Sequence, residues 1–389
     1  MYPNLYYIFK DLFNVDLPFL KVVNSFGFFV AIAFLVSAWL LGKELKRREK
    51  LGVFTFNETT ITIGKPASMA DLLVNAFLGF TLGFKIIGVF ITEGALENPQ
   101  AFIFSKEGNW GAGILLALFF AGLKWWEKNK EKLAKPETRT LRIWPSDRVG
   151  DITIISAAGG FVGAKIFDNL ENWDRFIKDP IGNLLSPSGL TFYGGLIVAI
   201  LALWYYFHKN NISFIRVADT TAPVLLLSYS MGRIGCQVAG DGDWGIYNPH
   251  VNPYSWLPDI LWSYDYPHNV NSEGVPMMNC DWGDYCNHLP APVYPTPLYE
   301  IIICFILFLL LWSVRKRFTT TGRLFAVYLI LNGIERFFIE KIRVNTEYDI
   351  FGFHPTQAEL ISSLLVIAGV VLYIYAPKIY ASKQKPAAG

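Results

Sequence analysis

The sequence contains nine apolar segments of about 20 residues, and these segments constrain the fold more than any other feature. A helix needs about 20 apolar residues to cross the hydrocarbon layer of a bilayer. Hydrophobic residues make up 52% of the chain and charged residues only 17%, which is unlike a soluble domain. We therefore predict an all-α, polytopic integral membrane protein with about nine transmembrane helices. They are expected at residues 25–42, 71–92, 109–125, 150–167, 189–208, 217–236, 296–314, 322–341 and 356–377.

The loops between these segments differ in basic charge. Alternate loops on one side hold 23 lysines and arginines, whereas the opposite set, with the N-terminus, holds 7. Because short cytoplasmic loops retain basic residues, we predict that the N-terminus is outside and the C-terminus is cytoplasmic. Residues 240–295, between helices six and seven, contain no lysine or arginine and are predicted to form an extracytoplasmic cap. Cys280 and Cys286 lie in this loop and would be able to form a disulfide outside the cell.

Two arginines are predicted to lie inside the membrane region, near its outer side. Arg233 is close to the outer end of the sixth segment, and Arg336 is about two-thirds of the way across the eighth. A guanidinium is costly in lipid and therefore indicates a function. Arg336 and Glu340 share one helical face, and Glu300 begins the seventh segment on the same side. Two guanidinium groups so placed predict a site for a phosphate, most directly that of a phospholipid headgroup.

The second and fourth segments carry one residue pattern twice. The residues Asp71, Gly79, Gly83 and Lys85 have the same mutual spacing as Asp151, Gly159, Gly163 and Lys165. The two segments are either copies of one ancestral helix or a coincidence between two glycine-rich membrane helices.

Other classes of site find little support in the composition. The five histidines are scattered and Cys280 and Cys286 lack a second cysteine pair, so we predict no metal and no cofactor. A net charge of +2 gives no support for nucleic-acid binding.

Several motifs together resemble those of the prolipoprotein diacylglyceryl transferase family. They are Gly-Arg-Ile-Gly-Cys at 232–236 with Gly240 and Trp244-Gly245, Gly-Leu-Thr-Phe-Tyr-Gly-Gly-Leu at 189–196, Thr-Pro-Leu-Tyr-Glu at 296–300, and the arginine-bearing stretch 332–343. The resemblance implies transfer of a diacylglyceryl group from phosphatidylglycerol to the lipobox cysteine of a prolipoprotein signal peptide, with release of glycerol phosphate. It also implies a multi-pass protein of the bacterial cytoplasmic (inner) membrane.

The resemblance implies roles for individual residues. Arg233 and Arg336 would hold the lipid phosphate and stabilise the charge that builds on it, and the general base is left open between Tyr193, Asp241 and Asp243. The substrate-binding residues are expected to be Gly194, Gly195, Glu300, Tyr299, Glu340, Arg343 and Gln357. The chain departs from the family at Tyr193, where a histidine is common, and at Cys236, where an asparagine is frequent. We interpret Cys236 as a packing residue.

The resemblance also implies a division of the chain. Residues 1–149 would form an N-terminal transmembrane region of about three helices outside the best family match, and residues 150–377 the transferase-like core. The cap 240–295 is inserted in that core, and residues 378–389 form a basic cytoplasmic tail. Two alternatives remain: a catalytically inactive protein that binds phospholipid or signal peptides, and a transporter for an anionic lipid. The sequence leaves acyl-chain preference and oligomeric state open.

Overall fold

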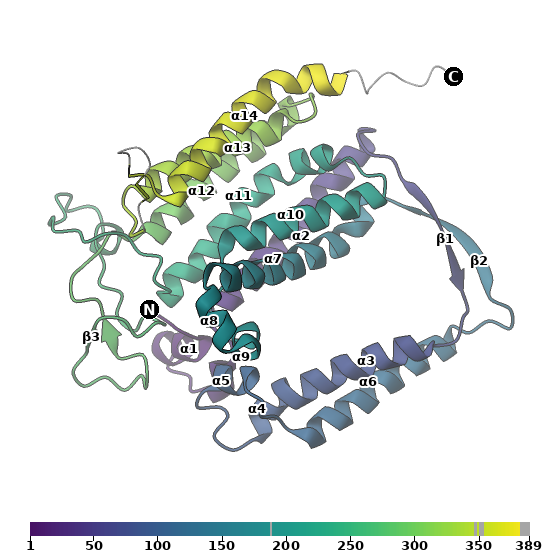
Figure 1. The fold of residues 1–389 in the computed structure, drawn as a ribbon, viewed down its shortest axis with the longest axis horizontal. Coiled ribbons are helices and arrows are strands. Elements are labelled where there is room, and N and C mark those ends of the chain that lie inside the picture. The colour runs from purple at the N-terminus through teal and green to yellow at the C-terminus, as the bar shows by residue number, and fades with distance from the viewer. Residues whose placement is uncertain (187–188, 346–347, 350–353, 382–389) are drawn as a thin grey trace. The chain divides into compact units, whose positions relative to one another are not determined.

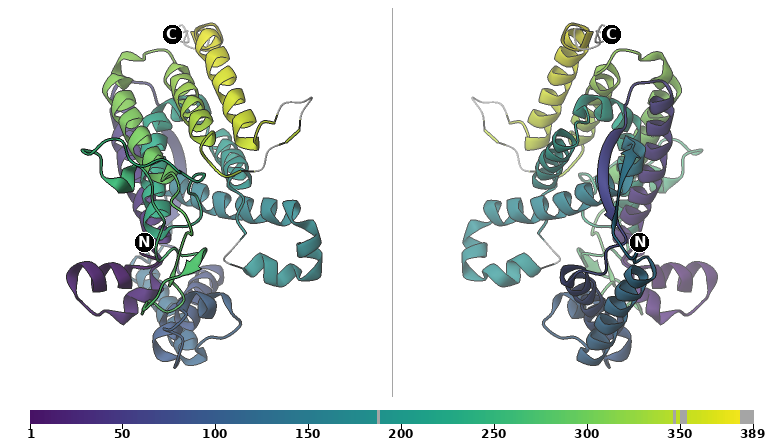
Figure 2. Two further views of the ribbon diagram at one scale, coloured as in Figure 1. Left: turned by 90° about the vertical axis from the view of Figure 1, so that its left-hand side faces the viewer. Right: turned by 90° about the vertical axis from the view of Figure 1, so that its right-hand side faces the viewer.

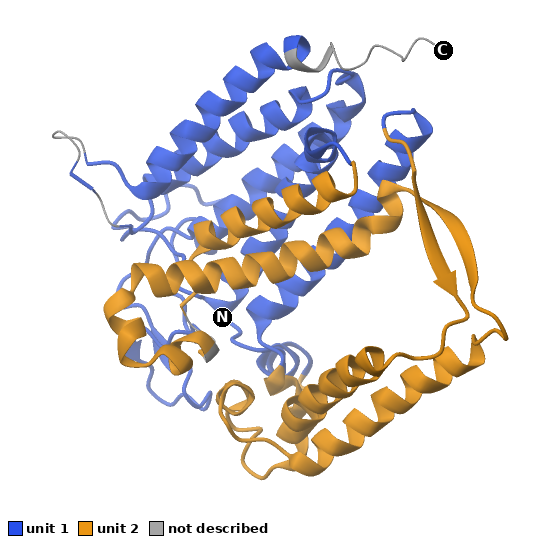
Figure 3. Cartoon of the chain, turned by 45° about the vertical axis from the view of Figure 1, so that its right-hand side comes forward, with its two compact units in different colours: residues 1–13, 23–53, 212–389 blue, residues 14–22, 54–211 orange. Residues whose placement is uncertain are grey.

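The computed structural model describes residues 1–186, 189–345, 348–349 and 354–381. The chain forms two compact units, coloured separately in Figure 3, and each is described by itself. Unit 1 contains residues 1–13, 23–53 and 212–389, and unit 2 contains residues 14–22 and 54–211. Residues 382–389 of the predicted basic tail lie outside the described residues.

Unit 1 is built from long helices. They are α2 (Ser25–Lys50), α11 (Phe214–Ala239), α12 (Thr296–Val314), α13 (Arg323–Glu340) and α14 (Gln357–Ala381), with the short α1 (Leu5–Phe13) and the 3-10 turn η5 (Arg315–Arg317) beside them. Helix α11 packs against α2 and α12, and α13 packs along α14 (Figures 1 and 2). The core of this unit consists of buried side chains from α2, α11, α12 and α13, among them Leu40, Leu226, Phe308 and Leu324.

Glycine fixes both the packing and the end of α11. A Cβ atom at Gly235 would lie 3.1 Å from the carbonyl oxygen of Phe26, so the small residue lets α2 approach closely. Gly240 follows the helix with a φ of 64°, and its N–H donates to the carbonyl of Cys236. This left-handed cap, which favours glycine, stops α11 just before Asp241 and Asp243.

The segment between α11 and α12, residues 240–295, is folded rather than extended. It contains the 3-10 turn η4 (Asp259–Leu261) and the antiparallel strands β3 (Val275–Pro276) and β4 (Asn287–His288). Tyr266 and Asn269 are fully buried in it, and the Asn269 amide donates to three backbone carbonyls. Cys280 and Cys286, whose pairing the sequence left open, form a disulfide.

Unit 2 contains two helical hairpins. In the first, α3 (Met69–Thr81), the π-helical turn η2 (Leu82–Ile87) and α4 (Gly88–Ile91) are followed by α6 (Trp110–Lys130), which packs against α3 and η2. In the second, α7 (Val149–Glu171) packs against α10 (Phe192–Lys209) (Figure 1). The shorter elements of this unit are η1 (Pro18–Val22), α5 (Pro99–Phe104), η3 (Pro145–Arg148), α8 (Trp173–Lys178) and α9 (Pro180–Leu185).

Two strands of unit 2 were not expected. Strands β1 (Asn57–Ile63) and β2 (Glu137–Ile143) form an antiparallel ribbon in stretches that the prediction left as loops. The sequence Asn-Glu-Thr-Thr-Ile-Thr-Ile is rich in β-branched residues, which favour strands, and its burial alternates along β1. The chain is therefore mostly helical rather than all-α.

Five helical stretches are long and apolar enough to cross a membrane, which agrees with a polytopic membrane protein. They are Ser25–Lys50, Met69–Ile91, Pro145–Glu171, Thr296–Arg317 and Gln357–Lys378. The other predicted segments also coincide with helices, namely α6, α10, α11 and α13. The number of crossings and their direction stay predictions.

Candidate active site

Three arginines and three carboxylates from separate elements of unit 1 form one cluster. Helix α11 carries Arg233, α12 carries Glu300 in its second turn, and α13 carries Arg336 and Glu340. Arg343 follows the end of α13, and Asp243 follows the end of α11. We call these six residues the arginine–carboxylate cluster.

Glu300 lies at the centre of this cluster. Its side chain is fully buried, and its Oε2 atom lies 2.9 Å from Arg233 Nε. Its Oε1 atom lies 3.4 Å from Arg336 Nη1. The Tyr229 hydroxyl donates to the same Oε1 atom over 2.5 Å. One carboxylate thus joins α12 to both α11 and α13.

The loop after α11 adds the third carboxylate. Asp243 pairs through Oδ2 with Arg233 Nη1 and through Oδ1 with Arg343 Nη2, the latter at 2.6 Å. The backbone strengthens this link, because Gly245 forms a bridge with Arg343. Thr296 also donates its hydroxyl to the Asp243 carbonyl over 2.7 Å. Asp243 is therefore held as a counter-ion between two guanidinium groups.

Glu340 closes the far side of the cluster. Its Oε2 atom lies 2.8 Å from Arg336 Nη2, one helical turn away, and its side chain is fully buried. Its Oε1 atom accepts from Thr356 at 2.8 Å and from Asn345 at 2.6 Å. These bonds leave the carboxylate few ways to turn, so the Arg336 guanidinium is fixed in direction.

Asp241 and Asp243 differ in proton affinity although they are two residues apart. Burial raises the pKa of Asp243, but the charges of Arg233 and Arg343 outweigh burial and lower that pKa to about 2. Burial also raises the pKa of Asp241, and the neighbouring Asp243 carboxylate raises it further. Among the described residues no arginine forms an ion pair with Asp241, and its Oδ1 atom accepts from the Asp243 N–H over 3.4 Å. Asp241 is thus the stronger base of the two.

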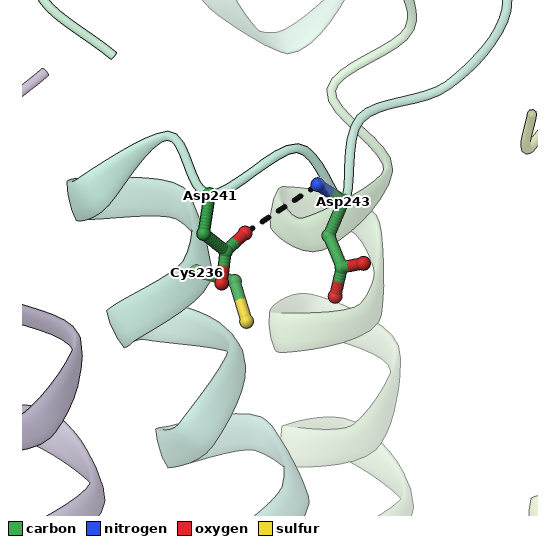
Figure 4. A group of neighbouring side chains, drawn as sticks. All are labelled: Cys236, Asp241 and Asp243. Atoms are coloured by element: carbon green, nitrogen blue, oxygen red, sulfur yellow. Dashed lines mark hydrogen bonds between the residues drawn. The ribbon is translucent and has the colours of Figure 1, made fainter. Parts of the chain in front are cut away.

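Figure 4 shows that Asp241 and Asp243 lie beside Cys236. Their ligand atoms are within 4.8 Å of one another, which makes this trio the candidate metal group among the described residues. A cation would meet strong competition there, because Arg233 and Arg343 already neutralise Asp243 and the Cys236 sulfur accepts from Arg233 over 3.5 Å.

The remaining predicted site residues lie in different settings. Tyr193, Gly194 and Gly195 begin α10 of unit 2, where Tyr193 is half-buried and both glycines are buried. The Tyr299 hydroxyl donates to the carbonyl of Leu261 over 2.9 Å. Gln357 is exposed at the start of α14. The catalytic role of Tyr193 and the substrate-binding roles of the other four residues stay predictions.

Sequence reasoning missed three polar residues around the cluster. Tyr229 lies one helical turn before Arg233, a spacing that would have revealed it. Thr356 precedes the exposed Gln357 and contacts Glu340 instead. Glu335 is buried, and neither of its carboxylate oxygens has a hydrogen-bond partner among the described residues. Helical spacing aligns Glu335 with Leu324, Tyr328 and Leu331 on the core-facing stripe of α13.

Known proteins are similar to this chain over much of its helical region. The family model for prolipoprotein diacylglyceryl transferase matches residues 109–375. The chain belongs to the prolipoprotein diacylglyceryl transferase family. Its relatives include phosphatidylglycerol–prolipoprotein diacylglyceryl transferases from Vibrio campbellii, 26% identical over 242 residues, and Finegoldia magna, 30% identical over 260 residues. These alignments cover 60% and 65% of this chain and 77% and 87% of the relatives. The predicted family is confirmed.

Membership of the prolipoprotein diacylglyceryl transferase family makes the chain a multi-pass membrane enzyme of the transferase class. A relative of the same name from Leptospira interrogans is 27% identical over 268 residues, with 56% of this chain and 76% of the relative aligned. The matched range contains every residue of the arginine–carboxylate cluster. Helix α2 lies before that range, although it packs along α11 in the structure.

Proposed function

We propose that this chain transfers a diacylglyceryl group from phosphatidylglycerol to the lipobox cysteine thiol of prolipoproteins and releases glycerol phosphate. The family and the names of the relatives support this activity. The observation that carries the proposal is the arginine–carboxylate cluster, in which Arg233 and Arg336 share the two oxygens of Glu300. This pairing brings two guanidinium groups from different helices to one place inside a membrane protein.

In this reaction the cysteine sulfur attacks the glyceryl carbon, and the bond from that carbon to the phosphate oxygen breaks. Negative charge then builds on the departing phosphate. Arg233 and Arg336 would bind this phosphate and stabilise the growing charge, since each guanidinium has five N–H donors and its carboxylate partners use only some of them. Glu300 and Glu340 hold both groups in place beforehand, so little reorganisation is needed during the reaction.

The attacking cysteine must lose its proton before or during the reaction. We propose that Asp241 accepts this proton, because Asp243 is already neutralised by two arginines and is a weak base. The raised pKa of Asp241 brings its proton affinity closer to that of a thiol, whose pKa is near 8.5 and falls beside arginines.

The same proposal includes a membrane topology. The N-terminus and loop 240–295 would be outside the bacterial inner membrane, the C-terminus inside, and about nine helices would cross. The disulfide in this loop supports an oxidising compartment. The basic residues of η5, which lies at the opposite end of α12 from Glu300, support a cytoplasmic location for that end.

An in vitro assay tests the activity directly. Purified protein is incubated with phosphatidylglycerol vesicles and a lipobox peptide, and the thioether-linked diacylglyceryl product is measured by mass spectrometry. Transfer by the parent protein, with strong loss in Arg233→Ala and retention in the control Arg317→Ala, would support the proposal. Arg317 is an exposed residue of η5 and provides a matched loss of one guanidinium outside the cluster.

Complementation separates transfer from binding without catalysis. When the host's own transferase is depleted, an active chain restores lipid-modified precursor and growth. A correctly inserted chain that binds phosphatidylglycerol but restores neither would favour the inactive binding protein, a reading motivated by Tyr193 at the position of the usual family histidine.

A further inference from the structure

The first hairpin of unit 2 repeats the packing of the second at matched positions. In the first, a Cβ atom at Gly83 of η2 would overlap the carbonyl oxygen of Ala112 in α6. In the second, a Cβ atom at Gly163 of α7 would overlap the carbonyl oxygen of Gly194 in α10. Each hairpin thus places a glycine of its first helix against the backbone at the start of its second helix.

The second helices also correspond along their sequences. Residues 112–118 read Ala-Gly-Ile-Leu-Leu-Ala-Leu, and residues 194–200 read Gly-Gly-Leu-Ile-Val-Ala-Ile. Two small residues and then an apolar run with one alanine occur in the same order in both. Gly83 therefore corresponds to Gly163 in the first helix of each hairpin, and Ala112 corresponds to Gly194 in the second. The two contacts thus join equivalent positions.

A lysine closes the same end of each hairpin. Lys85 donates to the carbonyls of Ser105 and Glu107, at 2.6 and 2.5 Å, in the connection that leads into α6. Lys165 donates to the carbonyl of Gly189 over 3.3 Å, in the connection that leads into α10. Recurrence of glycine, lysine and small-residue contacts in one spatial pattern favours duplication over chance.

The two ends of the first hairpin lie side by side. Asn57 pairs with Ile143 across the ribbon of β1 and β2, so the two ends of residues 57–143 are neighbours. Every residue of the arginine–carboxylate cluster lies outside this range. Tyr193 precedes the small pair of α10, whereas Gly111, without a side chain, precedes the small pair of α6. The family match, residues 109–375, includes both α6 and α10.

The outer faces of the first hairpin fit the acyl chains of a bilayer. Phe77 on α3 and Leu115 on α6 are each about two-thirds exposed, at 69% and 70%. Trp110 begins α6, and Trp125 and Trp126 lie near its other end, as expected for aromatic belts at two membrane interfaces.

We propose that residues 57–143 are a duplicated membrane hairpin that faces lipid and takes no part in catalysis. The copy at residues 149–209 is required for activity. This inference rests on the proposed transferase function, because it divides that activity between the two copies.

Matched substitutions in the two copies test whether only the copy at residues 149–209 is needed for transfer. Gly83→Leu and Gly163→Leu each introduce a side chain against the backbone of the neighbouring helix, which overpacks the contact. We expect Gly83→Leu to retain transfer within about threefold of the parent, and Gly163→Leu to lose at least about tenfold at equal membrane abundance. Equal loss in both variants would overturn the division.

A deletion provides a second measurement. Joining Phe56 directly to Trp144 removes residues 57–143, whose ends are neighbours in the ribbon. Transfer by the inserted deletion protein would support the proposal, and an inserted protein without transfer would overturn it. The parent protein is assayed first with phosphatidylglycerol and a lipobox peptide. A parent that fails this assay refutes the transferase function itself, whereas an active parent with an inactive Gly83→Leu variant refutes only the division.

Discussion

Arg233→Lys tests whether the cluster works through the forked shape of arginine or only through its charge. Arg233 reaches two carboxylates with different nitrogens, since Nη1 pairs with Asp243 and Nε lies 2.9 Å from Glu300. A lysine keeps the positive charge but has a single nitrogen on a flexible stem. It can therefore retain one of these partners in good geometry and must weaken the other.

The size of the effect follows from this lost contact. The Nη1 group of Arg233 donates a hydrogen bond to the charged Asp243, and such a bond contributes about 1.5 to 3 kcal/mol, which corresponds to a roughly 10- to 150-fold change in rate. We expect Arg233→Lys to lower kcat/KM for phosphatidylglycerol by this factor. The lysine still compensates much of the charge of Glu300 and Asp243, so membrane abundance should stay close to that of the parent.

The assay measures diacylglyceryl transfer to a lipobox peptide across a range of phosphatidylglycerol concentrations, with thermal denaturation in detergent recorded for each variant. Arg317→Lys, an identical change at an exposed arginine, is the control and should match the parent. A variant Arg233→Lys with parental kcat/KM and parental melting temperature would refute the argument from guanidinium geometry.

Four further outcomes follow from the site and its loop. Asp241→Asn should slow transfer by about 10²-fold or more. The parent rate should fall with decreasing pH through the raised pKa of Asp241, and the asparagine variant should lack this acid limb in a pH–rate profile. The Asp243 carboxylate, with its pKa lowered to about 2, contributes stability above the ordinary aspartate pKa of about 3.9, which is lost as pH falls toward 2. Asp243→Asn should therefore lower the melting temperature at pH 7, and the difference from the parent should shrink under acid. Replacing Cys280 and Cys286 by serine should destabilise the loop by about 2 kcal/mol, seen as faster proteolysis within it. Cys236→Ala should retain most of the transfer activity, because the nucleophile belongs to the substrate, and complete loss at normal abundance would contradict this view.

Much of the helical framework was predictable because a membrane helix has a fixed minimum length. The segments around α2, α7, α12 and α14 carry long apolar runs, and the structure places helices there. The pairing of Glu300 with arginines on neighbouring helices was also predictable, since helical spacing gives each polar residue a depth and a face. The predicted family provided the order of the motifs.

The rest depended on contacts that spacing does not encode. Asp243 lies in a loop, so its position between Arg233 and Arg343 follows from how residues 240–295 fold back on the helices. The π-helical turn around Lys85 breaks the regular period of the second predicted segment. The ribbon of β1 and β2 pairs residues far apart in the chain, and a polar strand in a loop gives no membrane signal.

The charges of the cluster explain why this loop belongs to the site. The helices and the end of α13 contribute three guanidinium groups. Among the described residues of these helices, Glu300 and Glu340 pair with the arginines, whereas neither carboxylate oxygen of the buried Glu335 has a hydrogen-bond partner. A buried, unpaired guanidinium would be costly, so the third carboxylate must come from elsewhere. Asp243 supplies it, and its side chain is 34% exposed, in contrast to the two helical carboxylates. A phosphate bound by the remaining N–H donors of Arg233 and Arg336 would therefore meet guanidinium groups that their carboxylate partners already hold in position.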